Sequence, residues 1–246
     1  MKVVIYNDTS KAFGKVHFGC QLVMESLNDL LAGAGFDIIG SVSLDDALAN
    51  RLDKPLLEKA DLIVANGEGS YHHNRRPDFI RIANKYPTAL INTVYEDNDD
   101  NLEYFKYIAA RESKSRDTIA KQVPCDLVPD VIFSSRYLAS IQSTQGGGCV
   151  SVQHFNGVRT LQDKANVVPA IASSDSIMTG SFHAGCVAAY YGKPLSLSAS
   201  NTHKMQGLAA DMGLRYMSDE AECADPDYVP IAQQRIASMI DKLKQC

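Results

Sequence analysis

Residues 61–70 read Asp61-Leu62-Ile63-Val64-Ala65-Asn66-Gly67-Glu68-Gly69-Ser70, so that an apolar run passes directly into a polar turn. Four consecutive apolar residues bounded by polar ones predict a short buried strand. The same order of apolar run, polar turn and helical pattern recurs along the chain. We expect further strands at 3–6, 36–39, 88–92, 107–111, 149–152, 176–179 and 194–197. Alternating strands and helices predict parallel sheets with right-handed crossovers, and hence an α/β fold.

Helical patterns fall between these strands, with apolar residues recurring about every 3.6 positions. The first pattern starts near residue 17, and Gly33 and Gly35 mark its end. Further helices are expected at about 113–122, 159–172, 202–212 and around 236–243.

A small, polar segment rich in glycine lies at 140–148 and is typical of a hinge. The strand and helix pattern starts again after it. The sequence therefore predicts two Rossmann-like halves, residues 1–140 and 148–246, that face a central cleft, with the last helix packing back on the first half. In such folds ligands bind beyond the carboxyl ends of the strands, which places the working surface in that cleft.

Composition excludes several classes of protein. The chain has 246 residues, of which 45% are hydrophobic, and a net charge of −5 with no basic run, which argues against binding to nucleic acid. Its six cysteines form no C-x-x-C pair, so we expect neither a disulfide framework nor a zinc site. No apolar stretch approaches the ~20 residues that span a bilayer, and the N-terminus lacks a signal-peptide core. We expect a cytoplasmic location.

Candidate ligand-binding residues in the first half lie at strand ends. Gly67 and Gly69 let the backbone approach a ligand and aim Glu68 into the cleft, as a base or as a partner for sugar hydroxyls. A tight turn with an exposed glutamate is the alternative interpretation. Asn7 begins a polar loop that reaches Gly19 before a helix, and the unpaired N–H groups of a helix start bind anions.

Three further positions carry charge or a titratable group. Arg111 ends an apolar strand and suits bidentate recognition of a carboxylate or phosphate. His183 follows Ser181 in a glycine turn that opens a helix of small residues. A lone histidine is more often structural than catalytic, but a place at a strand-to-helix junction favours function. Lys204 follows a loop after a strand, where it either binds phosphate or is an ordinary charged helix residue.

These motifs, taken in order, resemble the polysaccharide pyruvyl transferase superfamily. The likeness spans nearly the whole chain and is carried by Asn7, Gly19, residues 61–69, Ala110-Arg111-Glu112-Ser113-Lys114-Ser115, Val128-Pro129-Asp130, Thr179-Gly180-Ser181-Phe182-His183-Ala184, Gly192-Lys193-Pro194 and Lys204. It implies an architecture like the GT-B glycosyltransferases, with two Rossmann-like domains. It also implies transfer of a pyruvyl group from phosphoenolpyruvate to a sugar hydroxyl in polysaccharide or glycan biosynthesis.

The resemblance also implies roles for individual residues. Arg111 matches the family's donor-binding arginine, and His183 matches its histidine. We expect His183 to act as the acid, Glu68 to orient or deprotonate the sugar hydroxyl, and Lys204 to help hold the donor. No cofactor or metal is expected. The chain departs from the family in having Ser181 where an arginine is frequent, and Glu68 where a third glycine is frequent.

These departures leave two other functions open. One is a GT-B-type glycosyltransferase, in which His183 touches the phosphate of a sugar nucleotide and Glu68 is the base for the acceptor. The other is a glycan-binding protein without catalytic activity. In each enzymatic interpretation the acceptor is a saccharide, and the sequence specifies neither that saccharide nor the oligomeric state.

Overall fold

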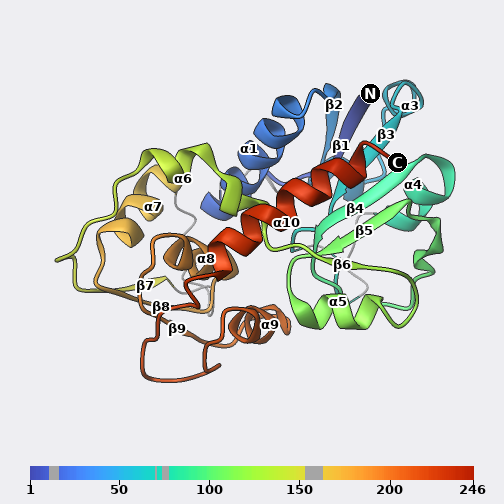
Figure 1. Cartoon of the computed structure of the whole chain (residues 1–246). Coiled ribbons are helices and arrows are strands. Elements are labelled where there is room, and N and C mark those ends of the chain that lie inside the picture. The colour runs from blue at the N-terminus through green and yellow to red at the C-terminus, as the bar shows by residue number, and fades with distance from the viewer. Residues whose placement is uncertain (11–16, 70, 74–77, 153–162) are drawn as a thin grey trace.

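The computed structural model describes residues 1–10, 17–69, 71–73, 78–152 and 163–246. In these residues nine strands form two parallel sheets (Figure 1). The first sheet has the order β2-β1-β3-β4-β5-β6, and the second has the order β7-β8-β9. The strands are β1 (Lys2–Asp8), β2 (Asp37–Ser43), β3 (Leu62–Asn66), β4 (Thr88–Thr93), β5 (Tyr107–Ala110), β6 (Asp126–Leu127), β7 (Cys149–Val152), β8 (Ser176–Thr179) and β9 (Leu195–Leu197). The α/β class with parallel sheets, expected from the alternating pattern, is confirmed.

Helices connect most of the strands. They are α1 (Phe18–Gly33), α2 (Leu44–Leu48), α3 (Lys54–Glu58), α4 (Phe79–Lys85), α5 (Ser113–Ile119), α6 (Arg136–Ser140), α7 (Lys164–Ser173), α8 (Phe182–Tyr190), α9 (Lys204–Asp211) and α10 (Tyr228–Leu243), with 3-10 turns η2 (Leu102–Tyr104) and η3 (Val131–Ser134). The helix expected at 159–172 is seen as α7, and the first residues of that range lie outside the described part, as does Ser70. No helix in the described ranges has the length and apolar character to cross a membrane.

The central strands β1, β3 and β4 of the first sheet are buried on both faces, which explains why they contain apolar runs. Along β1, Val3 and Ile5 belong to one hydrophobic core, and Val4 and Tyr6 belong to a second core on the other face. This division follows from the alternation of side chains across a strand.

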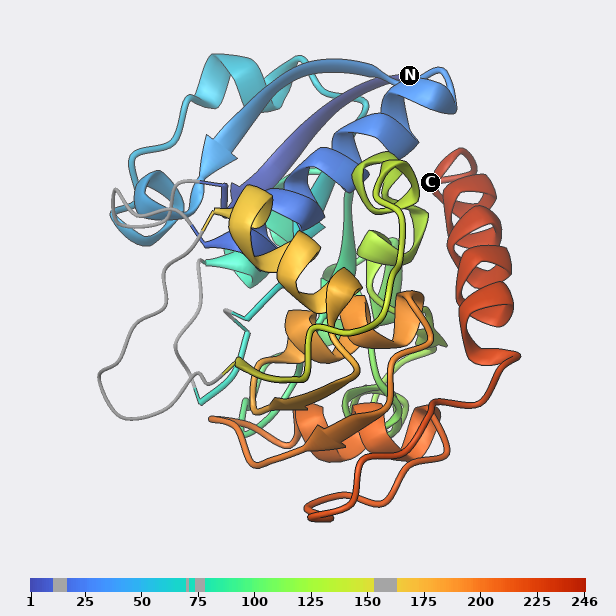
Figure 2. The same cartoon turned by 90° about the vertical axis from the view of Figure 1, so that its left-hand side faces the viewer.

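The first of these cores continues into the second sheet. Besides β1 and α1 it contains Ile177 of β8, Val187 of α8 and Leu197 of β9. Helices from distant parts of the sequence also meet here, since α1 and α7 lie side by side (Figure 2). A single apolar core therefore underlies both sheets.

The segment at 140–148 joins the two sheets, because β6 ends the first and β7 begins the second. The sequence predicts a hinge there, and in the structure the connection makes hydrogen bonds to the second half. The Asp175 carboxylate accepts bonds from the N–H groups of Gly146 and Gly148 at 2.7 and 3.0 Å, and Thr144 N–H donates to Ala172. The division into domains at 1–140 and 148–246 stays a prediction.

The last helix lies against the first half of the chain. α10 contacts β5 and η3, and its Ile236 and Met239 are buried in the core that underlies both sheets. Near its end Lys242 forms an ion pair with Asp126 at 2.5 Å.

Candidate functional site

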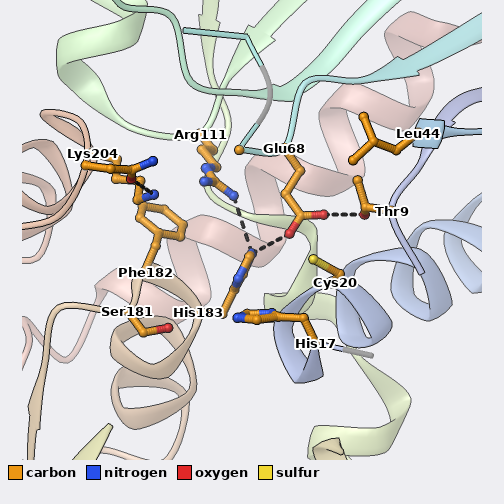
Figure 3. Close-up of a pocket in the computed structure, with 12 residues that line it drawn as sticks. Thr9, His17, Cys20, Leu44, Glu68, Arg111, Ser181, Phe182, His183 and Lys204 are labelled. Carbon is orange, nitrogen blue, oxygen red and sulfur yellow. Dashed lines mark hydrogen bonds and ion pairs between the residues drawn. The ribbon is translucent and has the colours of Figure 1, made fainter. Parts of the chain in front are cut away.

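A cavity of about 180 Å³ lies where the first sheet faces the start of α8 and α9 (Figure 3). The elements that reach it are the carboxyl ends of β1, β3 and β5 and the N-terminal ends of α1, α2, α8 and α9. Its lining consists of Thr9, His17, Cys20, Leu44, Glu68, Gly69, Arg111, Ser181, Phe182, His183, Asn201 and Lys204. The connections from β1 and β3 leave in opposite directions, and ligands bind at such switch points in α/β folds.

Glu68 is held from both sides of its carboxyl group. Thr9 donates its hydroxyl proton to Oε2 at 2.7 Å, and His183 Nε2 lies 3.2 Å from Oε1. The turn itself is fixed because Glu68 N–H donates to the side-chain oxygen of Asn66 at 3.2 Å. The carboxylate is 4% exposed, so it faces the cavity and not bulk water.

His183, on a helix of the second half, contacts side chains of the first half. It is the second residue of α8, and its Nε2 lies within reach of three groups from the first half, of which Figure 3 draws Glu68 and Arg111. Besides Glu68 these are Asp130 Oδ2 at 3.5 Å and Arg111 Nη1 at 3.4 Å. A proton on Nε2 therefore has two carboxylate acceptors in this arrangement, Glu68 and Asp130.

Asp130 is a site residue to which sequence reasoning gave no role. It is fully buried after β6, and its Oδ2 lies 3.1 Å from Arg111 Nη1. Burial alone would raise the pKa of Asp130, but the hydrogen bond and charge of His183 and the charge of Arg111 outweigh it and lower that pKa. Its place beyond the end of a parallel strand is the signal that could have singled it out.

Arg111 lines the cavity with most of its surface buried. It is 1% exposed, and its guanidinium lies 4.0 Å from the centroid of the Phe182 ring, a cation–π arrangement. One nitrogen is committed to Asp130, while Nε is buried without a hydrogen-bond partner in the described residues. The expected donor contact of Arg111 stays a prediction, and the pairing with Asp130 gives the residue a structural role.

Arg111→Ala is expected to destabilise the fold by ~3–5 kcal/mol, because it leaves the Asp130 carboxylate buried without its cation. Chemical denaturation measures this directly. Arg116→Ala is the matched control, since Arg116 is half-exposed and pairs with Asp117, and it should change stability by less than ~0.5 kcal/mol. Adding Asp130→Asn to Arg111→Ala should recover part of the loss. An Arg111→Ala protein as stable as the wild type would refute this interpretation of the pair.

Of the three predicted glycines, Gly69 lines the cavity, whereas Gly19 and Gly67 do not. Gly19 packs on His183, and a Cβ at Gly19 would lie 2.1 Å from His183 Nδ1. Gly67 packs against Thr93, where a Cβ would lie 2.3 Å from the hydroxyl, so its missing side chain makes room for the next strand. Gly69 does line the cavity, with a φ of +58° that favours glycine.

Of the other predicted residues, Ser181 and Lys204 line the cavity and Asn7 does not. Ser181 lines the cavity as the N-cap of α8, and its side chain makes no capping bond. Lys204 lines it from the start of α9. Asn7 lies behind the site, fully buried, and its amide donates to the Asn66 carbonyl, so it fixes the ends of two neighbouring strands.

A second histidine links the halves beside the cavity. His203 Nδ1 lies 3.3 Å from Glu96, and Nε2 lies 3.4 Å from the buried Glu112. Burial alone would lower the pKa of His203, but the hydrogen bond and charge of Glu112 and the charge of Glu96 raise it. In the described residues no group of three or more His, Cys, Asp or Glu side chains has the arrangement of a metal site.

The raised pKa of His203 makes stability depend on pH. Its stabilising contribution is complete below the unfolded value of 6.5 and is lost as pH rises through the higher folded value. The melting temperature of the wild type should therefore exceed that of His203→Gln by more at pH 6 than at pH 8.5. His73→Gln is the control, because His73 is exposed and pairs at the surface with Asp97. A difference independent of pH would contradict the assignment.

Comparison with known proteins supports the fold but does not identify a family. No protein-family model matches the sequence, and no curated protein matches it. A crystal structure of a functionally uncharacterized protein from Klebsiella pneumoniae is similar, with a TM-score of 0.62, 9% identity and coverage of 85% of this chain and 87% of that one. An α-glucosyltransferase in complex with UDP-glucose and DNA containing an abasic site has a TM-score of 0.45, 7% identity and coverage of 98% and 90%. The first likeness supports the α/β fold alone, and the second carries no argument.

Proposed function

We propose that this protein is a transferase that moves a pyruvyl group from phosphoenolpyruvate to a sugar hydroxyl. The observation that carries the proposal is the 3.2 Å contact between His183 Nε2 and Glu68 Oε1, inside a cavity lined by Arg111 and Lys204. A hydrogen-bonded acid and base suit a reaction that gives a proton to one reactant and takes one from another.

The size and charge of the cavity favour a small anionic donor. Its volume of about 180 Å³ lies below the ~300–1,000 Å³ of pockets that bury drug-sized ligands. Arg111 offers a planar donor group for a carboxylate or phosphate, and Lys204 is a second basic group on the same wall. Phosphoenolpyruvate carries both kinds of anion on a small carbon skeleton.

The proposed reaction uses the two site residues in turn. His183 gives a proton to the methylene carbon of phosphoenolpyruvate, which leaves an oxocarbenium-like centre at C2. A sugar hydroxyl bonds to C2 while Glu68 takes the hydroxyl proton. A second sugar hydroxyl displaces the phosphate, closing a ketal, and its proton leaves as part of hydrogen phosphate. The proton on Glu68 then passes to His183 through their hydrogen bond, which restores the pair.

A donor panel tests the proposal. The protein is incubated with phosphoenolpyruvate or with UDP-glucose and other sugar nucleotides, each with a set of hexoses and hexose derivatives as acceptors. Phosphate release that requires both phosphoenolpyruvate and a sugar supports the proposal. Nucleotide release would favour a glycosyltransferase, and binding without turnover across the panel would favour a glycan-binding protein.

A further inference from the structure

Lys204 occupies an unusual position for a lysine. It is 7% exposed, and its Nζ donates to the side-chain oxygen of Asn201 at 2.6 Å. In the described residues no carboxylate lies within ion-pair distance of Nζ, although the amine lines the cavity between the two halves. Within the described residues, the hydrogen-bond partner of Nζ is thus a neutral amide.

The groups around Lys204 disfavour a positive charge on it. Burial removes water from the ammonium form, and the guanidinium of Arg111 repels a second cation. The titratable groups that face Lys204 from the surrounding elements are Arg111, Glu68, Cys20, Glu96 and His72. Burial makes the largest contribution and the charge of Arg111 the next, and together they lower the pKa of Lys204 to about 7. The carboxylates of Glu68 and Glu96 oppose this shift in part.

We propose that Lys204 is a neutral amine while the cavity is empty and takes up one proton from solvent when a small dianion binds. The amine lone pair accepts the proton, and no bond in the ligand breaks. The empty cavity then avoids two adjacent cations, and the second cation forms only when an anion is present to pair with it. The cavity would thereby select dianionic ligands over neutral ones. That phosphoenolpyruvate is the ligand rests on the proposed function, whereas proton uptake with a small dianion does not.

Two linked measurements follow from this inference. If the amine is mostly neutral at pH 8, binding should take up close to one proton for each ligand bound. The dissociation constant should also rise close to tenfold between pH 8 and pH 9, since binding is linked to the proton. Arginine stays protonated throughout this range, so Lys204→Arg should bind without taking up a proton.

The test is calorimetry at pH 8 in buffers of different ionisation enthalpy, with phosphoenolpyruvate and with inorganic sulfate as probes. Sulfate has no titrating group in this range, so protons taken up come from buffer to protein. Wild type, His183→Gln and Lys121→Met, an exposed lysine as control, should take up close to one proton. Lys204→Arg should take up none and keep its affinity, and Lys204→Met should bind at least tenfold more weakly.

The outcomes separate this inference from the proposed function. Uptake with sulfate but no binding of phosphoenolpyruvate would refute the donor and support the role of Lys204. Binding of either probe without proton uptake, or equal uptake in Lys204→Arg, would overturn the inference, as would no binding of either probe. If the variants fail to fold, the wild-type dissociation constant for sulfate decides, because a value unchanged from pH 8 to pH 9 would overturn the inference.

Discussion

His183→Gln should lower turnover by ~10²–10⁴ while leaving donor affinity within a few-fold, the loss typical of a missing general acid. Glutamine keeps an N–H group that can face Glu68 and Asp130, which lie 3.2 and 3.5 Å from Nε2 in the wild type. It cannot give up a proton as an acid near neutral pH. The rate of phosphate release from phosphoenolpyruvate, measured with saturating donor and acceptor, is the readout.

Donor affinity provides an independent check on the same variant. If the variant instead lost donor binding with little further loss in turnover, the histidine would be a phosphate contact. The glycosyltransferase interpretation would then be favoured over pyruvyl transfer.

Gly19→Ala should lower turnover by about 100-fold without any change in a charged or catalytic group. A Cβ at this position would lie 2.1 Å from His183 Nδ1, so the imidazole must shift. A displacement of ~1 Å in a reacting group can cost ~10² in rate. Turnover is measured per folded protein, because overpacking also costs ~1–3 kcal/mol of stability.

Gly33→Ala is the matched control at the other end of the same helix. The nearest atom to a Cβ there is Arg136 Nη2 at 3.9 Å, an ordinary van der Waals distance. This variant should keep wild-type turnover. If Gly19→Ala also kept wild-type turnover, the position of His183 against α1 would not matter for the reaction.

The sequence predicted the strands well because of where they lie. β1, β3 and β4 are covered on both faces, so most of their residues are apolar and stand out against polar turns. The ends of these strands then indicate the edge at which ligands bind. Glu68, Arg111 and His183 were selected on this ground, and the structure brings all three to one cavity.

The sequence could not predict contacts between residues that lie far apart in the chain. Asp130 and His183 lie far apart in the chain and meet because α8 packs against η3, of which Asp130 is the N-cap. The close packing of Gly67 on Thr93 of the next strand was likewise not predictable from local composition. Both contacts depend on the distances between elements, and these cannot be inferred from the spacing of residues within one strand or helix.

The core that underlies both sheets has a consequence for how the molecule unfolds. Ile5 of the first sheet and Leu197 of the second belong to the same cluster, so one face of the first sheet shares its apolar interior with the second sheet. Heating should therefore give one cooperative calorimetric transition and not two. A chain cut between β6 and β7 would leave each fragment with an apolar face in water, and such fragments would associate with each other or aggregate.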